Sequence, residues 1–167
     1  CRYLAEEVHA GAVIEISAPT GEFTLDAKES MPVVFLAERL GIAPVFTMVD
    51  ALAVENPARS VTVLYSTVDG EHFPFEAPLR HVVSRLPDGK LGVFFSKPLD
   101  TDEERVHYDV EGEIDVPRQK DLAFVDDADY FVAGPAEFVR KTTEQLIGLG
   151  VIHSRIHAQA IECGSAR

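Results

Sequence analysis

Two Gly/Pro turns that lie far apart in the sequence carry the residues best suited to chemistry. One is Gly41-Ile42-Ala43-Pro44, which follows the apolar run 32–37, and the other is Gly134-Pro135-Ala136-Glu137-Phe138, which follows the apolar run 129–133. Each run predicts a buried strand that ends at a turn and opens an amphipathic helix. In open α/β sheets, such turns and helix N-termini receive the pyrophosphate of a nucleotide. The two turns together therefore predict a nucleotide cleft.

The elements that must position these turns alternate along the chain from Pro32 onward. Near-continuous apolar strands between amphipathic helices are typical of a parallel sheet covered on both faces. We therefore expect an α/β fold with a five-stranded parallel sheet and helices on both faces. An acidic stretch between Lys97 and Asp121 contains Pro98, Gly112 and Pro117 and is expected to be an irregular surface excursion. The predicted strands are Val33–Ala37, Val61–Ser66, Leu91–Ser96, Tyr130–Ala133 and Arg155–Gln159, and the predicted helices are Pro44–Val54, Phe75–Leu86 and Ala136–Leu149.

The first 30 residues show a different pattern. Residues 2–9 predict a short helix, and residues 12–17 alternate as a half-buried strand does. The following Ala18-Pro19-Thr20-Gly21 has the composition of a turn.

Composition and charge restrict the class of protein. The 167 residues are 46% hydrophobic and 26% charged, which is ordinary for one globular domain. The net charge of −13 opposes nucleic acid or an anionic membrane as a partner. No apolar stretch is long enough to span a bilayer and no signal peptide is evident, so we expect a cytoplasmic protein. The chain begins at Cys1 without a methionine, which suggests a fragment whose upstream portion is missing.

Other reaction chemistries find no support in the sequence. Cys1 and Cys163 lie near opposite ends, with no pair at metal-ligand spacing, so we expect free thiols and no metal site. There is no Gly-x-Ser-x-Gly elbow and no Gly-x-x-x-x-Gly-Lys-Ser/Thr phosphate loop. Hydrolase, kinase and metalloenzyme functions are therefore disfavoured.

Several motifs in order resemble a known family. They are Tyr3-Leu4, Ala18–Phe23, Gly41–Pro44, Gly134–Phe138 and Leu149-Gly150-Val151. Their order resembles the reductase half of the ferredoxin-NADP reductase superfamily, and within it the C-terminal part of a flavohaemoglobin. The resemblance implies that residues 1–30 are the tail of a flavin-binding barrel and that residues 31–167 are an NAD(P)-binding domain.

The resemblance also implies a function and partners. The chain is expected to bind NADH or NADPH and pass hydride to a flavin, as part of a flavohaemoglobin-like oxidoreductase such as a nitric oxide dioxygenase. Most of the barrel is absent, so FAD is expected only with an additional flavin domain, and a flavin or globin domain supplied upstream is the expected partner.

The resemblance assigns Gly41, Ile42, Ala43 and Pro44 to the pyrophosphate, although this turn departs from the family pattern. The family has Gly-x-Gly-x-Thr-Pro, whereas this chain has Arg39 and Ala43 in place of the first Gly and the Thr. An Arg at a position built for Gly either disturbs the turn, since Gly alone is free at positive φ, or pairs with a phosphate.

After the second strand, Ser66 and Thr67 are expected at the adenosine ribose, or alternatively only cap a turn. Asp69 and Glu71 follow them. A 2′-phosphate needs Arg or Lys there, so carboxylates favour NADH over NADPH.

The nicotinamide side is assigned to Gly134, Pro135 and Phe138, with Ala133 replacing the Cys of the family's Cys-Gly-Pro. At the C-terminus the family's catalytic Glu and Phe correspond to Gln159 and Ile161, which lack the carboxylate and the aromatic ring. These substitutions leave an alternative open, namely a non-catalytic, degenerate reductase-like binding module.

Overall fold

The structure, a computed structural model, describes residues 3, 6–18 and 20–161. Its centre is a sheet of six strands in which every pairing is parallel, in the order β4-β3-β2-β1-β5-β6. The chain runs outward from β1 to β4 and then returns to the other side of β1 with β5, so the winding direction changes between β1 and β5. The strands are β1 (Val33–Glu38), β2 (Val61–Thr67), β3 (Gly89–Phe95), β4 (Val110–Glu111), β5 (Asp129–Gly134) and β6 (Ile156–Ala160).

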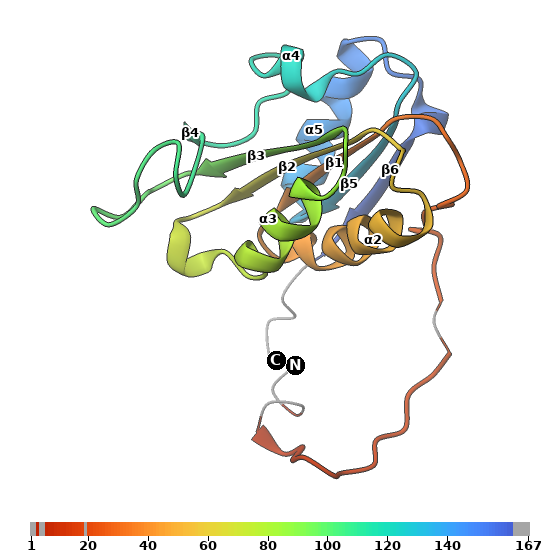
Figure 1. The fold of residues 1–167 in the computed structure, drawn as a ribbon, viewed down its shortest axis with the longest axis vertical. Helices are drawn as coiled ribbons and strands as arrows, with labels where there is room; N and C mark the ends of the chain where they lie inside the picture. Colours follow the sequence, from red (N-terminus) through yellow and green to blue (C-terminus); the bar gives the residue numbers. More distant parts are fainter. Residues whose placement is uncertain (1–2, 4–5, 19, 162–167) are drawn as a thin grey trace.

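Helices cover both faces of this sheet (Figure 1). The helices α2 (Ile42–Glu55) and α3 (Glu76–Ser84) pack on one face, and α4 (Lys120–Ala123) and α5 (Ala136–Gly148) pack on the other. Among the described residues, three single-turn 3₁₀ helices complete the connections: η1 (Arg39–Gly41), η2 (Gly70–His72) and η3 (His153–Arg155). The predicted α/β fold with a covered parallel sheet is confirmed.

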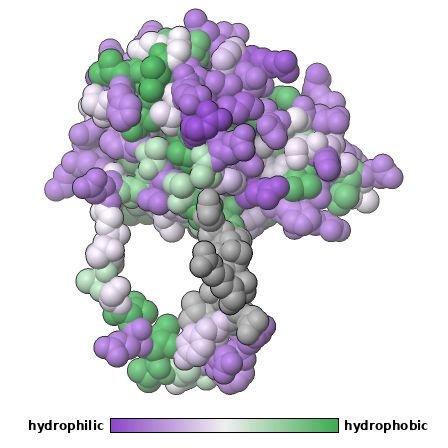
Figure 2. Space-filling view, turned by 180° about the vertical axis from the view of Figure 1, so that it is seen from behind, coloured by the Kyte–Doolittle hydropathy of each residue, from purple (hydrophilic) through white to green (hydrophobic). Residues whose placement is uncertain are grey.

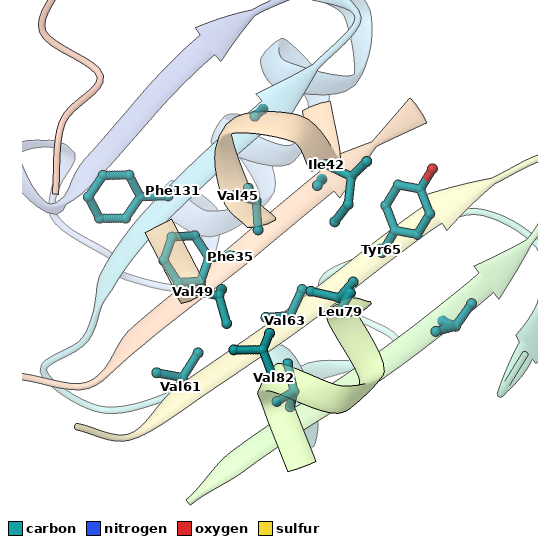
Figure 3. Close-up of a cluster of buried hydrophobic side chains, with 14 of the residues drawn as sticks. Phe35, Ile42, Val45, Val49, Val61, Val63, Tyr65, Leu79, Val82 and Phe131 are labelled. Atoms are coloured by element: carbon teal, nitrogen blue, oxygen red, sulfur yellow. The ribbon is translucent and has the colours of Figure 1, made fainter. Parts of the chain in front are cut away.

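Each face of the sheet carries its own hydrophobic core, because successive side chains of a strand point to opposite faces. In β1, Val33 and Phe35 pack beneath α2 and α3, whereas Val34 and Leu36 face α4 and α5. All four side chains are buried, because a strand between two helical layers has no solvent face. Figure 3 shows how apolar side chains from β1, β2 and β5 interdigitate with those of α2 and α3.

The sequence of α2 explains where it lies and where it begins and ends. Its buried residues, Ile42, Val45, Val49 and Leu52, recur at three- and four-residue spacing and form one apolar stripe. Pro44 lies in the first turn, where its missing N–H breaks no helical hydrogen bond. The helix ends before the sequence Asn56-Pro57, because a residue that precedes proline disfavours the helical conformation.

The sequence predicted the principal elements to within two residues but missed β4 and α4. The strand β4 lies within the segment 97–121, which we expected to be irregular throughout, and α4 begins at the end of that segment, so the sheet has six strands rather than five. The strand β4 has only two residues, both exposed, and it pairs with Phe94 and Phe95. Such a short strand forms because of its pairing with β3, and its own two residues carry no apolar periodicity that could predict it.

The strand expected at residues 12–17 is absent, and this prediction was wrong. The stretch is irregular and exposed, with Val13 and Ile16 98% and 80% exposed. Backbone amides form a strand only beside a partner strand, and the described part of the chain provides none. Figure 1 shows this stretch standing away from the body, and Figure 2 shows its apolar residues in the open. The expected helix over 2–9 lies partly outside the described residues, and within it the Glu7 N–H donates to the Tyr3 carbonyl at 2.9 Å.

Residues 23–31 are attached to the body. Phe23 packs edge-on against Phe131 of β5, with 5.5 Å between ring centroids. Buried Arg59 donates hydrogen bonds to the carbonyls of Met31 and Asp26, at 2.6 and 3.0 Å, and lies 3.6 Å from the Asp129 carboxylate. The boundary between residues 30 and 31 stays a prediction, and it falls at the end of this attached segment.

Among residues 3, 6–18 and 20–161, no helix has both the length and the apolar character needed to cross a bilayer. The same residues contain no group of three or more His, Cys, Asp or Glu side chains arranged to hold a metal ion.

Candidate functional site

The two Gly/Pro turns meet at the carboxyl edge of the sheet, between β1 and β5. A Cβ on Gly41 would lie 2.0 Å from the carbonyl oxygen of Ala133 and 2.8 Å from the N of Gly134. A Cβ on Gly134 would in turn lie 3.1 Å from the carbonyl oxygen of Glu38. The glycines therefore let the two turns pack backbone against backbone. Gly41 serves this close approach rather than a left-handed turn, since its φ is −58°.

The left-handed position of the first turn belongs to Arg39, whose φ is 51°. This is the position at which the family pattern has Gly, so the chain keeps the backbone turn and places an Arg in it. The Tyr65 hydroxyl of β2 donates to the Arg39 carbonyl at 3.3 Å and helps to hold the turn. Burial raises the pKa of Tyr65 to about 12, so this phenol stays a donor at neutral pH. Tyr65 was not predicted as a site residue.

The N-terminus of α2 opens directly from this turn. No side chain caps it, and its first turn contains no acidic residue. Uncapped N–H groups and the helix dipole favour an anion at such an end. The predicted residues contribute differently: Ile42 is buried in the core, Ala43 is exposed, and Pro44 has no N–H. The Ile42 N–H already donates to the carbonyls of Arg39 and Leu40, which closes the preceding 3₁₀ turn. Ala43 therefore contributes only backbone to the site, and Pro44 contributes only the shape of its ring.

Two cavities flank the Arg39 turn, and Arg39 lines both. The cavity of about 460 Å³ lies toward the end of β2, and the cavity of about 450 Å³ lies toward the end of β5. We name them the β2 cavity and the β5 cavity. The β2 cavity is lined by Arg39, Leu40, Thr67, Val68, Glu71, His72, Phe73 and Pro74. The β5 cavity is lined by Glu38, Arg39, Glu113, Ile114, Pro135, Glu137, Phe138 and Lys141.

At the β2 cavity the structure separates the two hydroxyl residues that were predicted together. Ser66 is 2% exposed and does not line the cavity. Thr67 lines it, but its hydroxyl donates to the His72 carbonyl at 2.8 Å and so closes the loop. Asp69 also turns away from the cavity and accepts from the ring and the backbone N of His72. Glu71 is the carboxylate that remains at the cavity.

Pro135 and Phe138 line the β5 cavity, and a Cβ on Gly134 would lie 2.9 Å from the Phe138 ring, while the assignment of these three residues to the nicotinamide stays a prediction. Burial, together with the nearby Glu113 carboxylate, raises the pKa of Glu38 above its ordinary value. The Arg39 guanidinium lies 3.9 Å from the Glu38 carboxylate.

Sequence reasoning missed three charged residues of the β5 cavity. Glu38 could have been predicted, because a charged residue directly after the apolar run 33–37 indicates a position at the end of the buried strand. Glu113 and Lys141 form an ion pair with N and O 3.5 Å apart, but they come from segments 28 residues apart, and no pattern in the sequence connects them.

The last described strand reaches the same edge. β6 pairs Gln159 with Ala133 of β5, and the Ile161 N–H donates to the Gly134 carbonyl at 2.7 Å. The Gln159 side chain is exposed and donates to the backbone carbonyl of Ala160. Ile161 packs against the core beneath α2. Gln159 and Ile161 therefore lie beside the turns, but they line neither of the two cavities.

Comparison with known proteins gives a consistent result. No family model matches the chain. It is 33% identical over 154 residues to a flavohemoprotein of Rhizobium meliloti, covering 92% of this chain and 38% of the relative. A flavohemoprotein of Chromobacterium violaceum gives the same identity and coverage. The chain thus spans less than half the length of these relatives, in their C-terminal part.

Solved structures share the fold. The flavohem-like FAD/NAD-binding domain of a nitric oxide dioxygenase from Vibrio cholerae superposes with a TM-score of 0.79 at 23% identity, covering 96% of this chain and 63% of that one. An Amycolatopsis cytochrome P450 reductase gives a TM-score of 0.78 at 18% identity, covering 94% of this chain and 46% of that one. The chain is therefore similar to the C-terminal part of flavohemoproteins and shares the fold of FAD/NAD-binding reductase domains.

Proposed function

We propose that this chain binds a nicotinamide dinucleotide across the β1–β5 edge and presents its nicotinamide to a flavin held by another domain. One observation carries the proposal: the uncapped N-terminus of α2, with Arg39 beside it, opens between two cavities of about 460 and 450 Å³. A dinucleotide has two bulky ends joined by a diphosphate. Its shape and charge match two cavities joined by an anion-binding turn.

The residues present fit this cofactor. The positive end of the α2 dipole and the Arg39 guanidinium bind the diphosphate, and the close-packed Gly41 and Gly134 leave the turns without side chains that block it. The β2 cavity receives the adenosine. The β5 cavity, with Pro135 and Phe138 on its wall, orients the nicotinamide. When bound, the reduced nicotinamide supplies the hydride.

The relatives support a proposal about the partners. Flavohemoproteins are the matched proteins, and the chain corresponds to 38% of the length of the first of them. We propose that flavin and globin domains joined upstream complete an oxidoreductase of the nitric oxide dioxygenase type, and that FAD binds only with the additional flavin domain. Residues 6–18, which include exposed Val13 and Ile16, are proposed to be the tail of the flavin-binding barrel, which would give that segment its partner strands.

The proposed cofactor is NADH rather than NADPH. Because Asp69 is directed at His72, Glu71 is the carboxylate that repels a 2′-phosphate, and the Arg39 guanidinium, which lines the same cavity, offsets part of that repulsion. Like-charge repulsion at an exposed site is worth about 1 kcal/mol, which corresponds to roughly fivefold in affinity. Titration calorimetry with both cofactors measures this ratio, and tighter binding of NADPH would refute the assignment.

Substitution of Arg39 tests the site itself. Arg39→Gly removes the cation between the two cavities, so NADH affinity should fall by roughly tenfold, as for a lost charge-assisted hydrogen bond. Arg105→Gly is the matched control, because Arg105 is also left-handed (φ 64°) and exposed but lines neither cavity. Equal binding by the wild type and both variants would show that this turn is not a nucleotide site.

Ala43→Thr restores the hydroxyl of the family pattern and should strengthen NADH binding by one hydrogen bond. The degenerate-module alternative receives no support from the relatives. NADH binding without flavin reduction, in a protein rejoined to a flavin domain, would nevertheless establish that alternative in place of hydride transfer.

A further inference from the structure

The loop that forms the rim of the β2 cavity is held by a buried carboxylate. Asp69, 6% exposed, accepts from the backbone N of His72 at 3.0 Å, and its Oδ1 lies 2.6 Å from the His72 Nδ1. Thr67 adds a hydrogen bond to the His72 carbonyl. The Gly70 N–H donates to Asp102, which anchors the loop from the neighbouring segment. The imidazole of His72 is 63% exposed, so its backbone and one ring nitrogen are fixed while the rest of the ring faces the cavity and solvent.

The Asp69 contact decides which nitrogen of His72 carries the proton. The same hydrogen bond to His72 holds the pKa of Asp69 below its ordinary value, so Asp69 is a carboxylate and can only accept. Nδ1 must therefore be the donor, which leaves Nε2 of the neutral ring as an acceptor. Within the described part of the chain, no hydrogen bond engages Nε2 of His72.

The rim of the β2 cavity therefore presents two acceptors, the Nε2 of His72 and the carboxylate of Glu71. Acceptors at a rim select a ligand that brings donors, and a ribose hydroxyl is a donor whereas a phosphate oxygen is not. The wall behind the rim is formed by Leu40, Val68, Phe73 and Pro74, which suits the flat apolar faces of a purine.

We propose that His72 is a specificity-determining residue that reads the 2′-hydroxyl of the adenosine ribose through Nε2, and that Asp69 is its positioning residue. This inference rests on the proposed function and deepens it, because it names the group on the ligand that is recognised. Glu71 acts with His72 as the second acceptor.

The experiment uses nucleotides that lack nicotinamide, so that it is independent of hydride transfer. ADP and 2′-deoxy-ADP are titrated into the wild type and into His72→Phe. The wild type should prefer ADP by about three- to tenfold, the range for one hydrogen bond, and His72→Phe should bind both equally. His81→Phe is the matched control, because His81 is exposed on α3 and lies outside the β2 cavity, and it should keep the wild-type ratio.

Asp69→Ala tests positioning. It should lower the preference for ADP, and the double variant Asp69→Ala/His72→Phe should lose no more of it than His72→Phe alone, because Asp69 acts through the ring. A loop that had merely collapsed would lose both nucleotides in proportion and keep their ratio, which would overturn the inference. A full preference for ADP in His72→Phe would also overturn it. Failure of the wild type to bind either nucleotide would overturn the proposed function and the inference with it.

Discussion

The contact between the two Gly/Pro turns predicts a large effect from one methyl group. In Gly41→Ala the new Cβ would lie 2.0 Å from the carbonyl oxygen of Ala133 and 2.4 Å from its carbon. Carbon atoms in proteins pack at about 3.5–4.0 Å, so the turns must separate by more than 1 Å. The obstructing atoms belong to a buried strand backbone, which cannot turn aside as a flexible side chain can.

The expected loss of stability follows from two opposing contributions. Overpacking costs about 1–3 kcal/mol and more where relaxation is blocked, whereas Gly→Ala at a compatible φ stabilises by about 0.4–1 kcal/mol through the unfolded chain. The net loss should be about 2 kcal/mol, which lowers the Tm of a chain of this size by about 4–8 °C. Scanning calorimetry and urea denaturation followed by circular dichroism measure this change.

Gly148→Ala is the control for the same chemical change. Gly148 is the last residue of α5, and a Cβ there meets nothing within 4 Å. It should therefore stabilise by about 0.4–1 kcal/mol. A Tm of Gly41→Ala at or above that of the wild type, or shifts of both variants in the same direction, would show that the contact at Gly41 does not limit stability.

Three further predictions concern the site and its support. Arg39→Gly should raise the Tm even as it weakens NADH binding, because a non-Gly residue at φ 51° costs about 1 kcal/mol; a lower Tm in calorimetry would show that the Arg39 side chain contributes more than its strain. Glu38→Gln should stabilise at neutral pH, because a carboxyl whose pKa is raised in the folded state is penalised once pH exceeds its unfolded pKa. That gain should vanish as pH falls below the unfolded pKa, so urea midpoints that differ equally at every pH would contradict it. Arg59→Ala should cost about 3 kcal/mol by leaving the Asp129 carboxylate without its partner, and limited proteolysis should then cleave residues 23–31 faster than in the wild type.

The sequence predicted the fold well because the strands of a covered parallel sheet are apolar runs that local pattern alone identifies. It failed at β4, where two exposed residues become a strand only because Phe94 and Phe95 lie beside them. It failed again at residues 12–17, where an alternating pattern finds no partner strand among the described residues. In both cases pairing between segments, rather than local preference, decides the structure.

The site was predicted less completely. The turns at Gly41 and Gly134 follow from strand and helix boundaries, which the pattern records. The direction of a side chain cannot be read from strand and helix boundaries. Neither the orientation of Asp69 toward His72 nor the burial of Ser66 was therefore predicted. Glu113 lines the β5 cavity but was not predicted there, because it belongs to the segment 97–121, which was expected to be irregular.

The position of β5 beside β1 affects how the chain emerges during synthesis. The register pairs Val33 with Asp129, so 96 residues separate the two partners. At about 5–20 residues per second, the apolar edge of β1 stays open on the ribosome for roughly 5–20 s after β1 is made. An unpaired apolar edge is a template for association between chains. We therefore expect truncations that end between β3 and β5 to aggregate, whereas chains that extend past residue 134 close their own sheet.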